Sequence, residues 1–235
     1  MDPPNANTFE IVYRLEAESM RWEFRVVIDA ETLEIATPPV QPPPNWTLLD
    51  FKQCSHCPLH PAQTPLCPLA AQLAGLIDRC SALISYEKVS VTVTTPQRSI
   101  VKDTTAQRAV GSLMGLLMAV SGCPKTRFFR PMARFHLPFA DEDETVFRST
   151  SSYLLGQYLR KAAGLEPDFD LEGLRQIYDD IQTLNADFSV RLGHAVEQDA
   201  SMNALVFLDL LAQYLTFGID ESMSSLRPMF AAFLE

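Results

Sequence analysis

A dense series of prolines between residues 38 and 68 constrains this chain more than any other feature. They occupy positions 38, 39, 42, 43, 44, 58, 61, 65 and 68. Because proline lacks a backbone N–H and clashes with the preceding helical turn, no long helix can cross this segment. The prolines from 38 to 44 predict an extended connector. Pro68 can begin a helix, since a proline in the first turn loses no hydrogen bond.

Three cysteines lie in the same segment, and a fourth occurs much later in a loop context. Cys54 and Cys57 form a Cys-x-x-Cys pair, Cys67 follows, and Cys123 comes after Gly122. Four thiolates are the ligand set of a tetrahedral zinc ion or of a [4Fe–4S] cluster. Three of these cysteines precede proline, as a ligand of bacterial ferredoxins does, which slightly favours iron–sulfur over zinc. We predict a metal site built from all four thiols.

Other interpretations of the cysteines remain open. His56 or His60 can replace one thiolate in a zinc site of three cysteines and one histidine. Cys54 and Cys57 have the spacing of a dithiol redox centre, although Pro61 and Pro65 interrupt the long helix that follows such a pair in thioredoxin-like proteins. The thiols can also be reduced and metal-free. Cys80 lies on the apolar face of the predicted helix, so we interpret it as a core residue.

A basic cluster follows Cys123 in an otherwise acidic protein. It consists of Lys125, Arg127, Arg130 and Arg134. Such a cluster can neutralise an anionic metal cluster, bind a small ligand that carries phosphate or carboxylate, or pair with nearby acidic residues. We therefore predict these four side chains as cofactor-binding candidates.

The hydrophobic pattern predicts an α+β fold. Apolar residues alternate over 9–15 and 22–28, and again over 89–93 followed by 98–101, which predicts two hairpins of one antiparallel sheet. A helix is expected from Pro68 to about residue 84. The sequence Thr104-Thr105-Ala106-Gln107 has the pattern of a capping box and predicts a buried helix that ends at Gly122.

The remaining chain has helical periodicity without a strand signal. Helices are expected at about 144–163, 170–188, 199–218 and 226–234, with a loop from 123 to 141. The expected organisation is an antiparallel α+β half at 1–103 that contains the cysteines, followed by a C-terminal helical bundle at 104–235. We expect the two halves to pack as one unit.

Composition narrows the class of protein. The formal net charge of −10 argues against nucleic acid and anionic membranes as partners. The N-terminus has no secretory signal and the apolar runs are too short to span a bilayer, so a cytoplasmic protein is expected. An odd number of cysteines also argues against a disulfide framework. A protein partner or a small anionic ligand is compatible with this sequence, which contains no motif that specifies a reaction and nothing that defines an oligomeric state.

Several motifs together resemble a family of uncharacterised bacterial proteins of similar length. They are Cys54-x-x-Cys57-Pro58, Cys67-Pro68, the run from Thr104 to Ala109 (TTAQRA), Ser121-Gly122-Cys123-Pro124, and the run from Arg130 to Phe139 (RPMARFHLPF). The resemblance implies a bacterial origin and a single architectural unit. It implies no activity, so the function has to be argued from the residues themselves.

Overall fold

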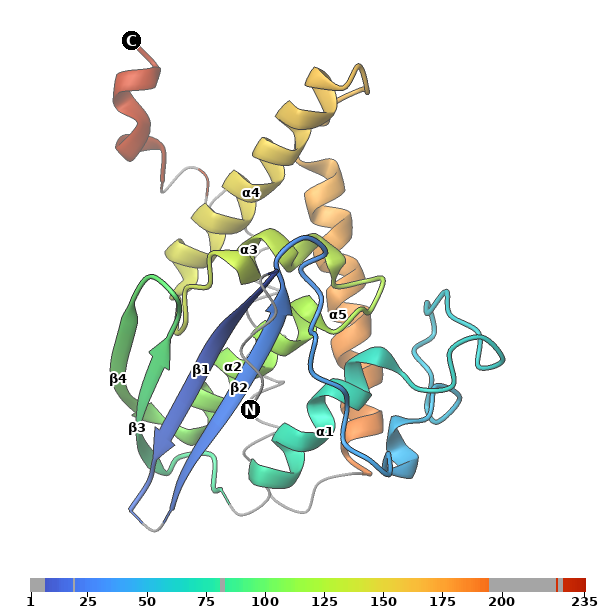
Figure 1. The fold of residues 1–235 in the computed structure, drawn as a ribbon. Helices are drawn as coiled ribbons and strands as arrows, with labels where there is room; N and C mark the ends of the chain where they lie inside the picture. The colour runs from blue at the N-terminus through green and yellow to red at the C-terminus, as the bar shows by residue number, and fades with distance from the viewer. Residues whose placement is uncertain (1–6, 19, 81–82, 195–222, 224–225) are drawn as a thin grey trace.

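The N-terminal part of the chain forms a four-stranded antiparallel sheet (Figure 1). The structure is a computed structural model that describes residues 7–18, 20–80, 83–194, 223 and 226–235. The strands are β1 (Thr8–Glu16), β2 (Arg21–Asp29), β3 (Lys88–Thr94) and β4 (Ser99–Thr105), in the order β2-β1-β3-β4. Both predicted hairpins are present, and β1 joins them by pairing with β3.

Two helices cover one face of this sheet. They are α1 (Pro68–Cys80) and α2 (Ala106–Val120); in Figure 1 α2 lies behind the strands and α1 lies beside β2. Alternate residues of β1, such as Ile11 and Leu15, are about 1% exposed and face the buried side of these helices. Cys80 is also 1% exposed within this core, in agreement with its predicted helical phase. The sheet and the two helices thus provide the rigid framework of the molecule.

The described chain after β4 is helical apart from its connecting loops, which confirms the predicted α+β class. It contains α4 (Glu142–Ala162) and α5 (Glu172–Leu192), with the short elements η1 (Asn45–Thr47) and η3 (Arg227–Phe233) elsewhere. The C-terminal end of α5 contributes Leu184, Phe188 and Leu192 to the main core. Its upper part packs with α4 in a smaller second core. The main core therefore draws on both sides of the predicted boundary at residue 103.

The structure differs from two local predictions, and a third concerns residues that it does not describe. The capping box at the start of α2 does not form, because Thr105 ends β4 and makes no side-chain cap. The N–H groups of Ala106 and Gln107 donate instead to the carbonyls of Glu87 and Ser85. The predicted loop 123–141 contains η2 (Arg127–Phe129) and α3 (Arg130–Arg134), which are too short for a periodicity signal. The helix predicted at 199–218 lies outside the described residues.

A buried polar chain links the sheet to α2 and to the segment after α3. The Tyr13 hydroxyl lies 2.8 Å from Ser112 Oγ and 2.5 Å from His136 Nε2. Burial, followed by the positive charge of Arg148, lowers the pKa of His136 to about 3. His136 is therefore neutral in the folded protein at pH 7 and well below it.

This burial predicts that acid destabilises the fold through His136. Between the ordinary pKa of 6.5 and the folded value of about 3, the unfolded chain binds a proton that the folded chain does not. Neutral His136 thus contributes fully to the free energy of unfolding above pH 6.5. This contribution is lost as the pH falls toward 3, by up to about 1.4 kcal/mol per pH unit. Urea unfolding across this range should show a smaller loss for His136→Gln than for the wild type. The exposed His60→Gln control should follow the wild type, and identical curves for all three proteins would contradict the assignment.

Candidate metal centre

The loop that carries the first two cysteines is closed at its base and folded back on itself. Leu48 and Leu66 form an isolated antiparallel bridge, and the N–H of Cys67 donates to the carbonyl of Thr47 over 2.8 Å. Within the loop, the N–H of Cys57 donates to the carbonyl of Cys54 over 3.1 Å. This tight turn brings both thiols of the Cys-x-x-Cys pair to the same region.

The other two cysteines are positioned by helix ends. Cys67 directly precedes α1, where its sulfur accepts hydrogen bonds from the N–H groups of Ala70 and Leu69. Cys123 follows α2 after Gly122, whose φ of +86° is a conformation that glycine adopts without strain. The Cys123 sulfur likewise accepts from the N–H groups of Lys125 and Thr126. Backbone donors of this kind favour a negatively charged sulfur.

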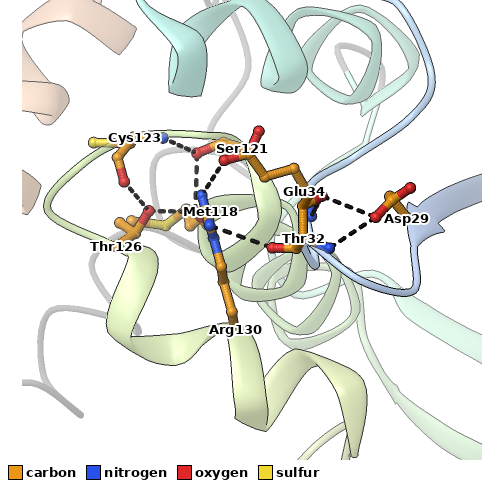
Figure 2. A network of polar contacts seen from close by, with 8 residues as sticks. All are labelled: Asp29, Thr32, Glu34, Met118, Ser121, Cys123, Thr126 and Arg130. Carbon is orange, nitrogen blue, oxygen red and sulfur yellow. Dashed lines mark hydrogen bonds and ion pairs between the residues drawn. The ribbon is translucent and has the colours of Figure 1, made fainter.

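Side-chain hydrogen bonds hold the segment around Cys123 (Figure 2). Ser121 Oγ and Thr126 Oγ1 donate to the carbonyl of Met118, over 2.9 and 2.6 Å. Ser121 Oγ also accepts the N–H of Cys123 over 3.2 Å. Figure 2 shows that the Cys123 sulfur points away from this network. The turn after α2 is therefore fixed while its thiol stays available.

All four predicted thiols line one small cavity of about 20 Å³. They come from the cysteine loop, the start of α1 and the end of α2, and α5 closes the remaining side with Leu184, Phe188 and Arg191. Lys125 and His56 also line the cavity, and none of the described lining residues is Asp or Glu. Residues that are far apart in the sequence are thus brought to one site whose ionisable groups are thiols, an imidazole and two cations.

Burial keeps the thiols of Cys54, Cys67 and Cys123 protonated when nothing is bound to them. It is the main cause that raises the pKa of Cys54 to about 12 and of Cys123 to about 11, and it raises the pKa of Cys67 as well. The neighbouring thiols raise these pKa values further, since thiolates that lie close together repel one another. Arg191 acts in the opposite direction on Cys54 and Cys67. Multiple thiolates can therefore coexist here once a cation compensates their charge.

Arg191 is the functional candidate that the sequence did not identify. Its position near the end of a predicted helix is typical of a solvated charge, yet the residue is 0% exposed. Its Nη1 donates to the carbonyls of Trp46 and Leu48 over 2.8 and 2.6 Å, and Nη2 donates to that of Leu49 over 3.2 Å. It forms no ion pair with a carboxylate that the structure describes. A buried positive charge thus lies beside the thiols and anchors the base of their loop.

Further contacts with α5 hold the cysteine loop in place. The N–H and the hydroxyl of Ser55 donate to Asp187 Oδ2 over 2.7 and 2.8 Å. His56 Nε2 donates to the carbonyl of Asp180 over 3.0 Å, which leaves Nδ1 as the lone-pair nitrogen, buried without a partner. His56 therefore retains the chemistry of a possible ligand.

The predicted basic cluster divides between two regions. Lys125 borders the thiol cavity and pairs with Asp180 over 2.8 Å. Arg130 contacts the carbonyl of Thr32 and the carboxylate of Glu34 (Figure 2). Arg127 lies over the ring of Phe128. Arg134 lies over the rings of Phe9 and Phe135. Of the four cations, only Lys125 is among the residues that line the thiol cavity.

The thiols are not arranged around a single ion in this conformation. Among the described residues, no group of three or more His, Cys, Asp or Glu side chains has the geometry to hold a metal ion. Zinc–sulfur bonds of about 2.3 Å place tetrahedral thiolates about 3.8 Å apart. A single ion would therefore have to draw the four sulfurs together.

Fold and site together define an α+β protein with a buried cluster of thiols between its sheet-bearing part and a long helix. A family model described as a domain of unknown function (DUF6901) matches residues 10–231, so the chain belongs to this family. No curated protein and no solved structure gave a match. Among the described helices, none combines the length and apolar character that crossing a bilayer requires.

We expect Arg191 to contribute far more to stability than an exposed arginine does. Arg191→Leu removes the guanidinium donor from three partly or fully buried loop carbonyls, of which only that of Leu48 keeps a second donor, the N–H of Phe51, among the described residues; the change should cost about 3 kcal/mol of unfolding free energy. Arg14→Leu removes a surface ion pair with Glu23 and should cost less than about 1 kcal/mol. Urea unfolding of both variants measures the difference. Equal losses would show that Arg191 does not anchor the loop.

Proposed function

We propose that this protein binds a thiolate-ligated metal centre through Cys54, Cys57, Cys67 and Cys123. The observation that carries the proposal is that these four thiols, from three separate segments, line one cavity. The raised pKa values of Cys54, Cys67 and Cys123 do not oppose it, because a bound metal cation displaces the thiol protons and compensates the thiolate charges. The backbone donors to Cys67 and Cys123 lower the cost of that change.

The surrounding charge also fits an anionic centre. Four thiolates around one Zn²⁺, or around an oxidised [4Fe–4S] core, carry a net charge of about −2. Arg191 and Lys125 border the cavity with two positive charges, and Asp180, the partner of Lys125, is not among the lining residues. Arg191 is the stronger support, since it is fully buried and bonded only to neutral carbonyls.

We favour a [4Fe–4S] cluster over a single zinc ion. In a cubane each thiolate binds a different iron, so the four sulfurs do not have to come as close together as around one ion. The cavity of about 20 Å³ holds roughly one or two water molecules, so a cubane requires the cysteine loop to move outward. Only turns, irregular stretches and a single bridge occur in this loop between residues 48 and 66, so its movement need not disrupt the sheet or the helices.

The proposed role of the centre is structural, redox-sensing or electron-transferring. It would join the cysteine loop, α1 and α2 at a point that α5 covers. A Cys54–Cys57 dithiol centre is the alternative redox function. The raised pKa of Cys54, about 12, disfavours that alternative, because thiol–disulfide exchange requires a thiolate.

Metal analysis after anaerobic purification tests the proposal. We expect about four iron atoms and four acid-labile sulfides per chain, with the broad visible absorption of an iron–sulfur cluster. If the protein is colourless and contains about one zinc per chain, the four cysteines remain the proposed ligands and the bound metal is zinc instead of an iron–sulfur cluster. A folded protein that contains neither metal, and that takes up neither during reconstitution under reducing conditions, would overturn the proposal.

Matched cysteine variants test the ligand assignment. Cys123→Ser should lower the metal content at least severalfold, because it removes a ligand. Cys80→Ser should leave the metal content unchanged, because Cys80 lies in the core and not at the cavity. Circular dichroism should first establish that both variants are folded. Equal metal contents in the two variants would contradict the division of the thiols.

A further inference from the structure

A second and larger cavity lies on the other side of the Cys123–Thr126 segment. Its volume is about 170 Å³, and it is bordered by α2, by the segment from η2 to the start of α4, and by α5. A dry cavity of about 150 Å³ in another protein accepts a benzene molecule. The space is therefore suited to a ligand with a body of roughly one aromatic ring.

Most of the cavity wall is apolar. Side chains of this wall come from Phe129, Met132, Leu137 and Phe139. Gly111 and Gly115 of α2 also line the cavity, and they do so with backbone atoms alone because glycine has no side chain. An apolar wall of this kind favours a hydrocarbon body over a strongly hydrated one.

The charged lining residues of the same cavity are all cations. Lys102, Arg108 and Arg148 line it, and none of the lining residues that the structure describes is Asp or Glu. This is notable in a chain whose formal net charge is −10. Lys102 and Arg108 are exposed, whereas Arg148 is largely buried. The cavity thus combines a positive potential with an apolar wall.

Arg148 has one N–H donor, that of Nε, without a partner among the described residues. Its Nη1 donates to the carbonyl of Leu137 over 3.0 Å, while Nε is buried without a hydrogen-bond partner. It forms no ion pair with a described carboxylate. The nearby Glu144 accepts the N–H of Asp141 over 3.0 Å and caps α4 instead. A buried guanidinium in this state is costly unless an anion pairs with it.

Among the described groups whose charge acts on Arg148, Glu144 is the only carboxylate. Burial is the main cause that raises the pKa of both Tyr13 and Tyr178, so both phenols are uncharged at pH 7. His136, whose pKa burial lowers to about 3, is uncharged as well. The missing partner of Arg148 therefore has to come from outside these residues.

We propose that this cavity binds a small organic carboxylate, with its carboxylate on Arg148 and its apolar body against α2 and the phenylalanines. Guanidinium pairs with carboxylate through two parallel hydrogen bonds, and Nε of Arg148 has no partner among the described residues. This site lies beyond the proposed metal centre, shares none of its thiols and does not depend on metal binding.

Benzoate is a suitable probe, with benzyl alcohol as its neutral analogue. The chain contains nine glycines, so selective ¹⁵N-glycine labelling gives a simple NMR spectrum of the full protein. Titration with benzoate should shift the signals of Gly111 and Gly115, which line the cavity, with a Kd below about 1 mM. The signal of Gly164, beyond the far end of α4, should stay unchanged.

Two arginine variants of α4 separate the ion pair from nonspecific binding. Arg148→Met should weaken benzoate binding at least about tenfold, whereas Arg160→Met, at an exposed position of the same helix, should not change it. Benzyl alcohol should bind more weakly than benzoate to the wild type and equally to both variants. If Arg148→Met is unfolded, Arg148→Lys, which keeps the charge without the planar fork, should show an intermediate loss.

Three results would overturn the proposal. The first is that the signals of Gly111 and Gly115 do not shift at about 10 mM benzoate, ten times the expected upper limit of the Kd. The second is that benzoate binds the wild type and Arg148→Met with equal affinity. The third is that benzyl alcohol binds as tightly as benzoate. Inorganic phosphate that binds as tightly as benzoate would overturn the apolar part, because phosphate has no hydrocarbon body.

Discussion

The guanidinium of Arg191 connects the two parts of this molecule. From the last turn of α5 it donates to three carbonyls at the base of the cysteine loop, those of Trp46, Leu48 and Leu49. These carbonyls would otherwise be buried beside a helix that offers them no donor. The contact therefore places α5 against the loop, and with it the closing wall of the thiol cavity. Its energetic cost is the burial of a charge, which an anionic centre beside it would offset.

The charges that line the two cavities differ in sign from the net charge of the chain. The protein carries a formal net charge of −10, yet the charged residues that line both cavities are cations. Acidic residues lie nearby but do not line the cavities: Asp187 bonds Ser55 and raises the pKa of Cys54, Asp180 pairs with Lys125, and Glu144 caps α4 and acts on Arg148. The charged side chains that line each cavity are nevertheless cations among the described residues, which is the reason that both proposals involve an anion.

The two cavities share walls. Cys123 and Lys125 border the smaller cavity, and Thr126, directly after them, borders the larger one. On α5, Leu184 faces the thiols and Asn185 faces the other cavity. Hydrogen bonds from Ser121 and Thr126 to Met118 hold the dividing segment. The same few residues therefore position both candidate sites.

Period-2 alternation in the sequence predicts β1, β2 and β3, since each of them buries residues of one face in the core. None of the residues of β4 is buried, so that strand is predicted only by its place after the turn at Thr95-Pro96. Pro68 marked the start of α1, and helical phase separated Cys80 from the other thiols. The capping-box pattern at Thr104–Gln107 was misleading, because β4 continues to Thr105 and carbonyls of the 85–87 segment satisfy the helix N-terminus. Local sequence patterns are reliable here where the partner is local, and they fail where a distant carbonyl takes that place.

What the sequence determined by itself is the α+β class, the set of four candidate thiols and the proline-limited loop that carries two of them. Only the tertiary structure decided that Cys67 and Cys123 meet the Cys54–Cys57 turn, because antiparallel packing brings the start of α1 and the end of α2 together. It also decided the roles of Arg191 and Arg148. An arginine in a helix is by default a solvated charge in a sequence pattern, and its burial depends on elements that pack against it from far along the chain.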